Sequence, residues 1–266
     1  MLSVHKRYVD TSFGQIHARV VAAAGEESQP PLLCLHPAPA SGLYFATAFP
    51  YLNAHRRIIA PDYPGYGGSD PLAEPPGIDD YAKAMLELVD AMEISGAVDV
   101  LGFHTGCLVG AEMALQRPDG VRRLLLCDVP FFSPEVRPGL FEKMAVPMPI
   151  DSTLDSIGNA WAFNVENRLA DVPLPRAFEL FAEHLRATDR DYFGFAAAFT
   201  YASEERFPLI TVDTTVLATQ SGLHGPSVSA AEVIPDATFV DVTEVETSVF
   251  ESGAEAISRR IDSALS

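Results

Sequence analysis

Short apolar runs, separated by turns and helical segments, most constrain how this 266-residue chain can fold. Each run has four or five residues, too few for a helix but enough for a buried strand. Such strands alternating with helices are typical of a parallel sheet that is covered on both faces. The runs in the first half of the chain are Pro31–Leu35, Arg57–Ala60, Val98–Leu101 and Leu124–Cys127.

Four further segments complete the predicted sheet. His5–Thr11 and Gln15–Ala22 alternate in polarity, which predicts antiparallel strands with one wet face. Thr215–Thr219 and Thr238–Val242 indicate two later strands, so we expect a mostly parallel eight-stranded sheet flanked by helices. The clearest helical patterns cover Ile78–Ser95, Leu108–Gln116 and Glu251–Leu265.

Residues 131–207 interrupt this alternation of strands and helices. The stretch is punctuated by prolines, is mostly helical in pattern, and holds ten of the 16 phenylalanines and the single tryptophan, Trp161. We therefore predict a helical cap over the C-terminal edge of the sheet, where parallel sheets bind ligands. Residues 1–130 and 208–266 would form the core. The alternative is an insertion whose aromatic residues pack only against one another.

Charge restricts the partners that we expect. The chain carries 18 basic and 36 acidic residues, a formal net charge of −18, which repels nucleic acids and anionic lipid surfaces. No run of 18 uncharged apolar residues predicts a membrane span. We expect a small-molecule partner, no nucleic acid, no membrane, and a monomer or homodimer. Three cysteines and no secretory leader predict free thiols in the cytoplasm.

The segment Val98–Gly110 carries the main functional signal. A strand is followed by Gly102-Phe-His-Thr-Gly106 and then by a helix. Glycines two residues before and after His104 allow a sharp turn from strand to helix. Such an elbow exposes its central side chain above the sheet, at the N-terminus of the helix.

On these residues the chain resembles the α/β-hydrolase fold superfamily over nearly its whole length. Leu33–Pro39 is similar to the family's oxyanion loop, and Ala60–Asp70 is similar to its loop after the fourth strand. Gln116–Leu126 resembles its third helix and sixth strand, and Gly102–Gly106 resembles its nucleophile elbow. The resemblance implies the fold far more specifically than it implies the chemistry.

The family's catalytic triad is missing at all three positions. The elbow residue is usually Ser, sometimes Asp or Cys, and here it is His104. The stretch Val216–Ala231, which matches the usual position of the acid, contains no Asp or Glu, and no histidine follows His224. Thr247 is the best match to the lost base, so the ordinary Ser-His-Asp mechanism is excluded. The residues that match the acid, depending on register, are Ser221, Gly222 and His224.

His104 is the candidate catalytic group. A helix N-terminus disfavours the imidazolium, so the ring is expected to be neutral and able to accept a proton. The backbone N–H groups of Thr105 and, by the resemblance, of Ala38 remain as donors to an oxyanion. These groups predict general acid–base chemistry without an acyl intermediate. The alternative is that His104 is a relic or lines a pocket.

Candidate acid partners of His104 are Asp128, which ends the sixth strand, and Glu246, which with Glu244 flanks the lost base. Each can equally be a structural or solvated carboxylate. Three histidines near the sheet edge raise the possibility of a metal site, but they lack ligand spacing. We therefore expect no metal and no other cofactor. The remaining predicted pocket residues are His36, His224, Thr247 and Trp161.

Other nucleophiles are weaker candidates. Cys107 follows the elbow in the helix and is interpreted as a small buried side chain. Ser41 and Ser69 match structural turns of the family and have no evident base. The sequence predicts an enzyme that acts on a small, largely apolar substrate by hydrolysis or lyase-like proton transfer. The alternative is an inactive pseudoenzyme or a small-molecule-binding protein.

Overall fold

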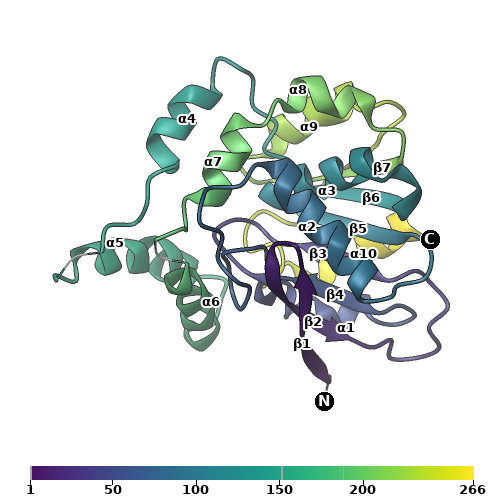
Figure 1. Ribbon diagram of the computed structural model, residues 1–266, viewed down its shortest axis with the longest axis horizontal. Helices are drawn as coiled ribbons and strands as arrows, with labels where there is room; N and C mark the ends of the chain where they lie inside the picture. Colours follow the sequence, from purple (N-terminus) through teal and green to yellow (C-terminus); the bar gives the residue numbers. More distant parts are fainter. Residues whose placement is uncertain (1, 151, 188) are drawn as a thin grey trace.

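The computed structural model describes residues 2–150, 152–187 and 189–266. One sheet has the strand order β1-β2-β4-β3-β5-β6-β7-β8 (Figure 1). The β1–β2 and β2–β4 pairs are antiparallel and the remaining pairs are parallel, which confirms the predicted mostly parallel eight-stranded sheet. The strands are β1 Val4–Thr11, β2 Gly14–Val21, β3 Leu32–Leu35, β4 Ile58–Pro61, β5 Val98–Phe103, β6 Val121–Cys127, β7 Asp213–Thr219 and β8 Thr238–Val242.

Helices bury both faces of the sheet. Successive strand side chains point to opposite faces, so Leu33 joins one apolar cluster while Cys34 joins the other. The first cluster includes residues of α2 (Ile78–Ala91), α3 (Thr105–Gln116) and α9 (His224–Val233). The second includes residues of the 3-10 helix η1 and of two further helices. Their bounds are η1 Gly42–Phe45, α1 Phe49–Leu52 and α10 Ala254–Leu265.

Helix boundaries differ from the prediction at several ends. Helix α2 stops at Ala91 instead of Ser95, because Glu93 and Gly96 take left-handed φ angles of 53° and 82° that reverse the chain. Helix α10 begins at Ala254, three residues later than predicted. Helix α3 begins at Thr105, three residues earlier than predicted, directly after the elbow.

The segment between β6 and β7 contains a series of short helices. In Figure 1, α4, α5 and α6 project to one side of the sheet, whereas α7 lies against the core. Four buried residues, Phe181 among them, form a small separate apolar cluster there, and Trp161 packs against it. The elements are α4 Arg137–Met144, α5 Asp155–Asn164, η3 Glu166–Arg168, α6 Leu174–Arg186, α7 Phe193–Thr200, α8 Ser203–Arg206 and η4 Phe207–Leu209.

Helix α7 rests directly on the loop after β3. The Gly194 N–H donates to the Tyr66 hydroxyl at 2.7 Å. A Cβ atom at Gly194 would lie 2.2 Å from the Ala38 Cβ, so only glycine allows this approach. The helical segment thereby presses against the loop that holds one of the predicted oxyanion donors.

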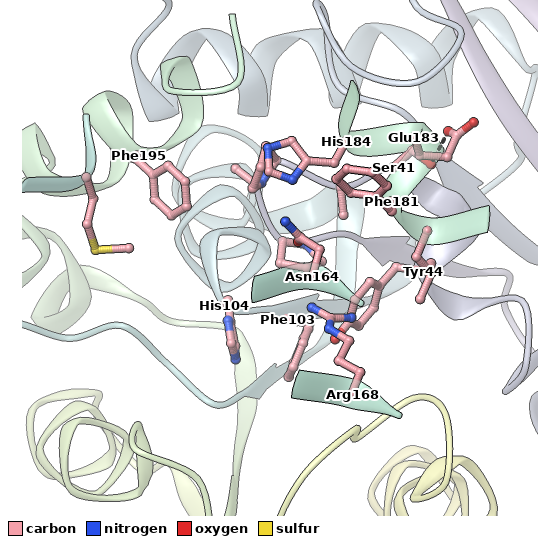
Figure 2. Close-up of a pocket in the computed structure, with 16 residues that line it drawn as sticks. Ser41, Tyr44, Phe103, His104, Asn164, Arg168, Phe181, Glu183, His184 and Phe195 are labelled. Atoms are coloured by element: carbon pink, nitrogen blue, oxygen red, sulfur yellow. Dashed lines mark hydrogen bonds between the residues drawn. The ribbon is translucent and has the colours of Figure 1, made fainter. Parts of the chain in front are cut away.

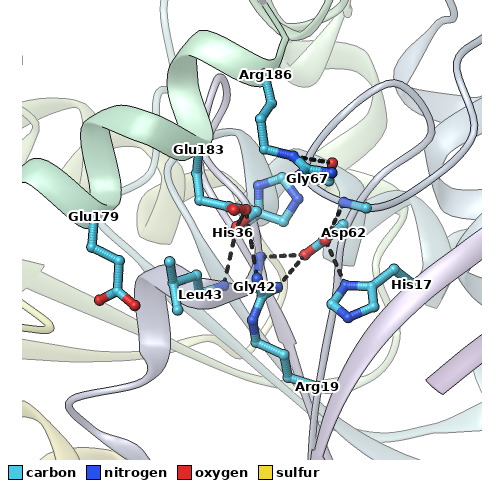
Figure 3. A network of polar contacts seen from close by, with 12 residues as sticks. His17, Arg19, His36, Gly42, Leu43, Asp62, Gly67, Glu179, Glu183 and Arg186 are labelled. Atoms are coloured by element: carbon cyan, nitrogen blue, oxygen red, sulfur yellow. Dashed lines mark hydrogen bonds and ion pairs between the residues drawn. The ribbon is translucent and has the colours of Figure 1, made fainter. Parts of the chain in front are cut away.

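Helix α6 is tied to the core by polar contacts. Glu183 accepts a hydrogen bond of 2.6 Å from the Ser41 hydroxyl, and Arg186 Nε donates to the Gly67 carbonyl at 2.9 Å (Figure 3). Arg176 forms an ion pair of 2.8 Å with Glu251. These contacts fasten α6 to the core.

Two further expectations concern thiols and membranes. Cys34, Cys107 and Cys127 are all free and buried. Within the described residues, no helix combines the length and the apolar character needed to cross a bilayer.

Candidate active site at the strand-to-helix elbow

His104 occupies a tight elbow between β5 and α3. Its φ of 49° and ψ of −117° lie outside the regions that side-chain-bearing residues usually adopt. A Cβ atom at Gly102 would lie 2.3 Å from the Gly106 carbonyl oxygen, and one at Gly106 would lie 2.0 Å from the Leu35 carbonyl oxygen. Both positions therefore require glycine. The surrounding backbone holds His104 in a conformation of a kind that concentrates at functional sites.

Three cavities meet at the His104 side chain. The first, of about 310 Å³, lies beneath the helical segment and is lined by Phe103, Phe181 and Phe195 among others (Figure 2). The second, of about 140 Å³, is lined by Thr105 and by apolar side chains. The third, of about 350 Å³, extends toward β7 and the loop after β8. The elbow residue thus faces space on the side of the sheet where the sequence predicts a ligand.

The imidazole of His104 is held in its neutral form. Burial lowers its pKa to about 4; the nearby Asp128 carboxylate acts in the opposite direction and the Arg168 cation acts with burial. The ring packs against Phe103 in a tilted arrangement, with centroids 4.0 Å apart. No group in the described part of the chain hydrogen-bonds to the ring. One ring nitrogen therefore offers a lone pair to a ligand in the cavity.

Asp128 lies close enough to His104 to affect the pKa of the imidazole, but its carboxylate oxygens accept hydrogen bonds from other residues. The carboxylate is fully buried and accepts hydrogen bonds from the Thr219 N–H at 2.8 Å and the Thr219 hydroxyl at 2.6 Å. The Ser221 hydroxyl donates a third, at 3.1 Å. Neutral donors at the end of β7 thus occupy the oxygens that a catalytic histidine would use.

The two glutamates near the lost base position are also apart from the imidazole. Glu246 lines the third cavity but is exposed, and Glu244 forms a surface ion pair of 2.7 Å with Arg260. Among the described residues, neither glutamate nor Asp128 hydrogen-bonds to His104. The candidate acid–base pair of the sequence analysis is therefore not assembled as a hydrogen-bonded dyad.

Two backbone donors lie beside His104. The N–H groups of Ala38 and Thr105 have no hydrogen-bond partner in the described ranges of the chain. Both residues line the second cavity together with His104. Thr105 is the first residue of α3, where an N–H has no acceptor within the helix. These two groups are available to hydrogen-bond an anionic oxygen.

Two of the four other predicted pocket residues are histidines, and both lie outside these three cavities. His36 is fully buried, and its ring nitrogens contact the Pro37 carbonyl at 2.9 Å and the Tyr63 N–H at 3.1 Å. His224 begins α9 and lies 3.2 Å from the Asp241 carboxylate. Within the described residues, no group of three His, Cys, Asp or Glu side chains is arranged to hold a metal ion.

Of the remaining two predicted pocket residues, Thr247 lines a cavity and Trp161 does not. Thr247 lines the third cavity, and its hydroxyl donates to the Asp171 carboxylate. Trp161 lines none of the three cavities, because it packs edge-on against Phe178 and Phe181 within the helical segment. The tryptophan supports the structure above the pocket instead of forming its wall.

The side chains of the alternative nucleophiles, Cys107, Ser41 and Ser69, all contact acceptors within the protein. Cys107 is fully buried, its thiol contacts the Gly102 carbonyl at 3.3 Å, and burial raises its pKa well above the ordinary value. The Ser41 hydroxyl donates to Glu183, and the Ser69 hydroxyl donates to the Asp62 carbonyl at 2.7 Å. None of the three groups has a histidine base.

The structure adds polar residues that the sequence analysis did not identify. They come from the helical segment and the loop after β3, and they line the first cavity among its aromatic side chains (Figure 2). No periodicity marks which faces of such short helices point inward, so no sequence signal identifies them. These residues are Tyr44, Asn164, Arg168, Glu183 and His184.

Solved structures share this architecture along the whole chain. A hydrolase from Pseudomonas aeruginosa PA01 has a TM-score of 0.81 and 22% identity, and the match covers 98% of each chain. The enol-lactonase from Burkholderia xenovorans LB400 has a TM-score of 0.78 and 18% identity, covering 97% of this chain and 99% of that chain. At this level of identity the likeness establishes the fold.

Curated relatives match over shorter regions. A 2-hydroxy-6-oxo-2,4-heptadienoate hydrolase of Pseudomonas putida is 34% identical over 95 residues, 35% of this chain and 34% of that protein. A haloalkane dehalogenase of Mycolicibacterium paratuberculosis is 35% identical over 104 residues, 37% of this chain and 34% of that protein. The matches thus span about a third of these relatives. Residues 30–209 match the α/β hydrolase fold family, so the chain belongs to that family.

Proposed function

We propose that this protein acts on a small, largely apolar substrate beneath a helical cap of residues 131–207, with His104 as the proton acceptor. The observation that carries the proposal is a neutral imidazole at the elbow, facing cavities beside two unpartnered backbone N–H groups. An acidic C–H or a water molecule would lose its proton to His104. The N–H groups of Ala38 and Thr105 would stabilise the resulting oxyanion. The reaction is a hydrolysis or a lyase-like proton transfer without an acyl-enzyme.

A substrate screen tests this proposal. Relatives and structural neighbours include a hydrolase of 2-hydroxy-6-oxo-2,4-heptadienoate and an enol-lactonase, which supports testing dienoates, lactones and esters. We expect turnover of at least one class above the rate in protein-free buffer. Absence of turnover across all classes, with a ligand still bound in the pocket, would instead support the second candidate function.

The second candidate is a small-molecule-binding protein without catalysis. The specific observation in its favour is that the Asp128 carboxylate is satisfied by Thr219 and Ser221, so no acid among the described residues orients His104 by a hydrogen bond. In that case the imidazole, packed against Phe103, serves as part of the pocket wall. Mass spectrometry of compounds that co-purify with the protein would identify the ligand directly.

Ser41 and Ser221, which line two of the cavities, are expected not to react with a fluorophosphonate probe. Ser41 and Ser221 donate to Glu183 and Asp128, and neither hydroxyl has a histidine to take its proton. Labelling is measured by intact-protein mass spectrometry, with a Ser-His-Asp hydrolase as the positive control. Stoichiometric labelling that disappears in Ser41→Ala or Ser221→Ala would contradict this prediction.

The imidazole of His104 is expected to stay neutral in mildly acidic solution. An unperturbed histidine titrates near pH 6.5, whereas burial lowers the pKa of His104 to about 4. The neutral, proton-accepting form therefore persists as pH falls from 8 to 5. NMR follows the ring resonances, and their loss in His104→Ala assigns them. A midpoint near pH 6.5 would show that the ring is solvated and is not held neutral.

A further inference from the structure

We propose that Arg168 is a carboxylate-binding residue, so that the substrate or ligand of this site is a small organic acid with an apolar body. The inference rests on the proposed function in one respect only, that the cavity beneath the cap is the ligand site. It narrows the class of expected ligands from largely apolar compounds to those that also carry one carboxylate. Arg168 ends the 3-10 helix η3 and lines the first cavity together with His104.

Arg168 is the only Lys or Arg among the described residues that line the three cavities. It is half-buried and forms no ion pair with any described carboxylate. A cation that faces a largely apolar cavity without a counter-ion is costly, because buried charges are normally paired. A guanidinium presents two parallel N–H groups that match the two oxygens of a carboxylate.

The guanidinium is already oriented toward the cavity. Its central carbon lies 6.0 Å from the centroid of the Tyr44 ring, which is within the range of a cation–π contact. Figure 2 shows Arg168 extending past Phe103 into the space that His104 also faces. The Arg168 cation also contributes, after burial, to the lowered pKa of the His104 ring, and both residues line this cavity.

The other charged groups of the first cavity do not compete for this role. Glu183 accepts the hydrogen bond from Ser41 and lies 3.5 Å from the Arg19 guanidinium, so its charge is compensated from the core. His184 lies 3.4 Å from the Asp191 carboxylate. An arriving anion therefore finds one uncompensated positive group. In a chain with a net charge of −18, that single cation suits a monoanion better than a phosphate dianion.

The apolar part of the ligand would contact the aromatic side chains of the same cavity. Phe103, Phe181 and Phe195 line the same cavity of about 310 Å³, which accommodates a phenyl-sized group. A carboxylate on Arg168 would thus leave the apolar body between these rings and within reach of His104. In this arrangement the Arg168 guanidinium binds the carboxylate end of the ligand, and the phenylalanine rings enclose its apolar end.

Equilibrium binding of two matched probes tests the inference. Isothermal titration calorimetry at pH 7.5 compares 3-phenylpropanoate with the isosteric neutral 3-phenylpropanamide. We expect the wild-type protein to bind the acid at least about tenfold more tightly than the amide, the usual minimum for a charge-assisted hydrogen bond. In Arg168→Gln the difference is expected to shrink below about twofold, and Arg168→Lys should keep part of it.

Lys143→Gln is the matched control, because it removes one positive charge from the helical segment at an exposed position outside the cavity. It should keep the preference for the acid. Equal affinities for the two probes in the wild type would overturn the inference, as would binding of neither. Equal losses of acid and amide binding in Arg168→Gln would show a structural role only and would also overturn it. None of these readouts needs turnover, so failure of the His104 mechanism remains a separate result.

Discussion

Replacing His104 by alanine is expected to lower kcat/KM by roughly 10²–10⁴-fold, the usual contribution of a positioned general base. The imidazole is the only candidate base at the junction of the three cavities that carries a free ring nitrogen in the described residues. Without it, no described group beside the Ala38 and Thr105 N–H groups can accept the proton. The rate would be measured on the substrate found in the screen, with binding followed in parallel.

Two further variants make that result specific. His104→Gln keeps a polar side chain of similar length but offers no basic nitrogen, so it should lose activity as alanine does. Thr105→Ala leaves both backbone N–H donors in place and should retain activity within a few-fold. Wild-type turnover in His104→Ala would remove the histidine from the mechanism. If the wild type binds ligand without any turnover, and the His104 variants bind it with the same affinity, the protein would instead be a small-molecule-binding protein.

Replacing Asp62 by alanine is expected to destabilise the fold by about 3–5 kcal/mol, the cost of leaving a buried charge unpaired. The carboxylate is fully buried and accepts 2.8 Å hydrogen bonds from Arg19 and from the backbone N–H groups of Gly42 and Gly68 (Figure 3). His17 contacts it at 2.7 Å. Truncation leaves the Arg19 cation, which is only 7% exposed, with just the longer 3.5 Å contact to Glu183, and it leaves two buried N–H groups without their acceptor. Urea unfolding measures the loss.

The surface pair of Glu255 and Arg259 provides the control. Both side chains are more than half exposed, so Glu255→Ala should change the unfolding free energy by less than about 1 kcal/mol. A similarly small effect of Asp62→Ala would mean that water replaces the carboxylate at no cost. In that case the network would not stabilise the protein.

The pKa of Asp62 gives this stabilisation a pH dependence. Burial alone raises the pKa, but the hydrogen bond from His17 and the Arg19 charge outweigh it, so the net pKa lies below the ordinary value of 3.8. A depressed carboxyl pKa stabilises the folded state above the unfolded-state pKa. The contribution is lost as pH falls through the folded-state pKa. The Asp62 variant should therefore show a smaller decline of stability in acid than the wild type.

The hydrogen-bond network around Asp62 extends to residues that line the first cavity. Arg19 contacts Asp62 on one side and lies 3.5 Å from Glu183 on the other, and Glu183 holds Ser41 (Figure 3). Ser41 and Glu183 both line the first cavity. Loss of Asp62 would thus loosen the contact between α6 and the loop after β3.

The strands and the elbow were predictable because local chemistry determines them. Apolar runs such as Leu124–Cys127 read as strands because both faces of the sheet are buried. The elbow was readable because Gly102 and Gly106 approach backbone atoms too closely for any side chain. Helix α9 was not predicted: its buried residues are Ser227 and Ala230, which are too small to produce an apolar periodicity.

The neutral state of His104 follows from the sequence through the helix dipole, whereas in the structure it depends mainly on burial. The sequence analysis inferred a neutral ring from the helix dipole. In the structure, burial is the largest cause that lowers its pKa. Burial depends on segments distant in sequence, including Phe195 and Leu223, which line the cavities around the ring.

Hydrogen-bond partners were beyond the reach of sequence reasoning. Asp128 and His104 both follow strands that end at the same sheet edge, which made a pair plausible. The register of β6 and β7 places Cys127 beside Leu217 and thereby brings Thr219 to Asp128. Differences of an ångström or two decide which donor a carboxylate meets, and only the packed strands fix them.

By itself, the sequence determined the α/β-hydrolase fold, the histidine at the elbow and the absence of any histidine after His224. These follow from residue identity, apolar spacing and glycine positions, which act over a few residues. The tertiary structure alone decided that Asp128 is satisfied elsewhere and that Arg168 faces the cavity. Both depend on which distant segments pack together, because hydrogen bonds and ion pairs are set by position in space.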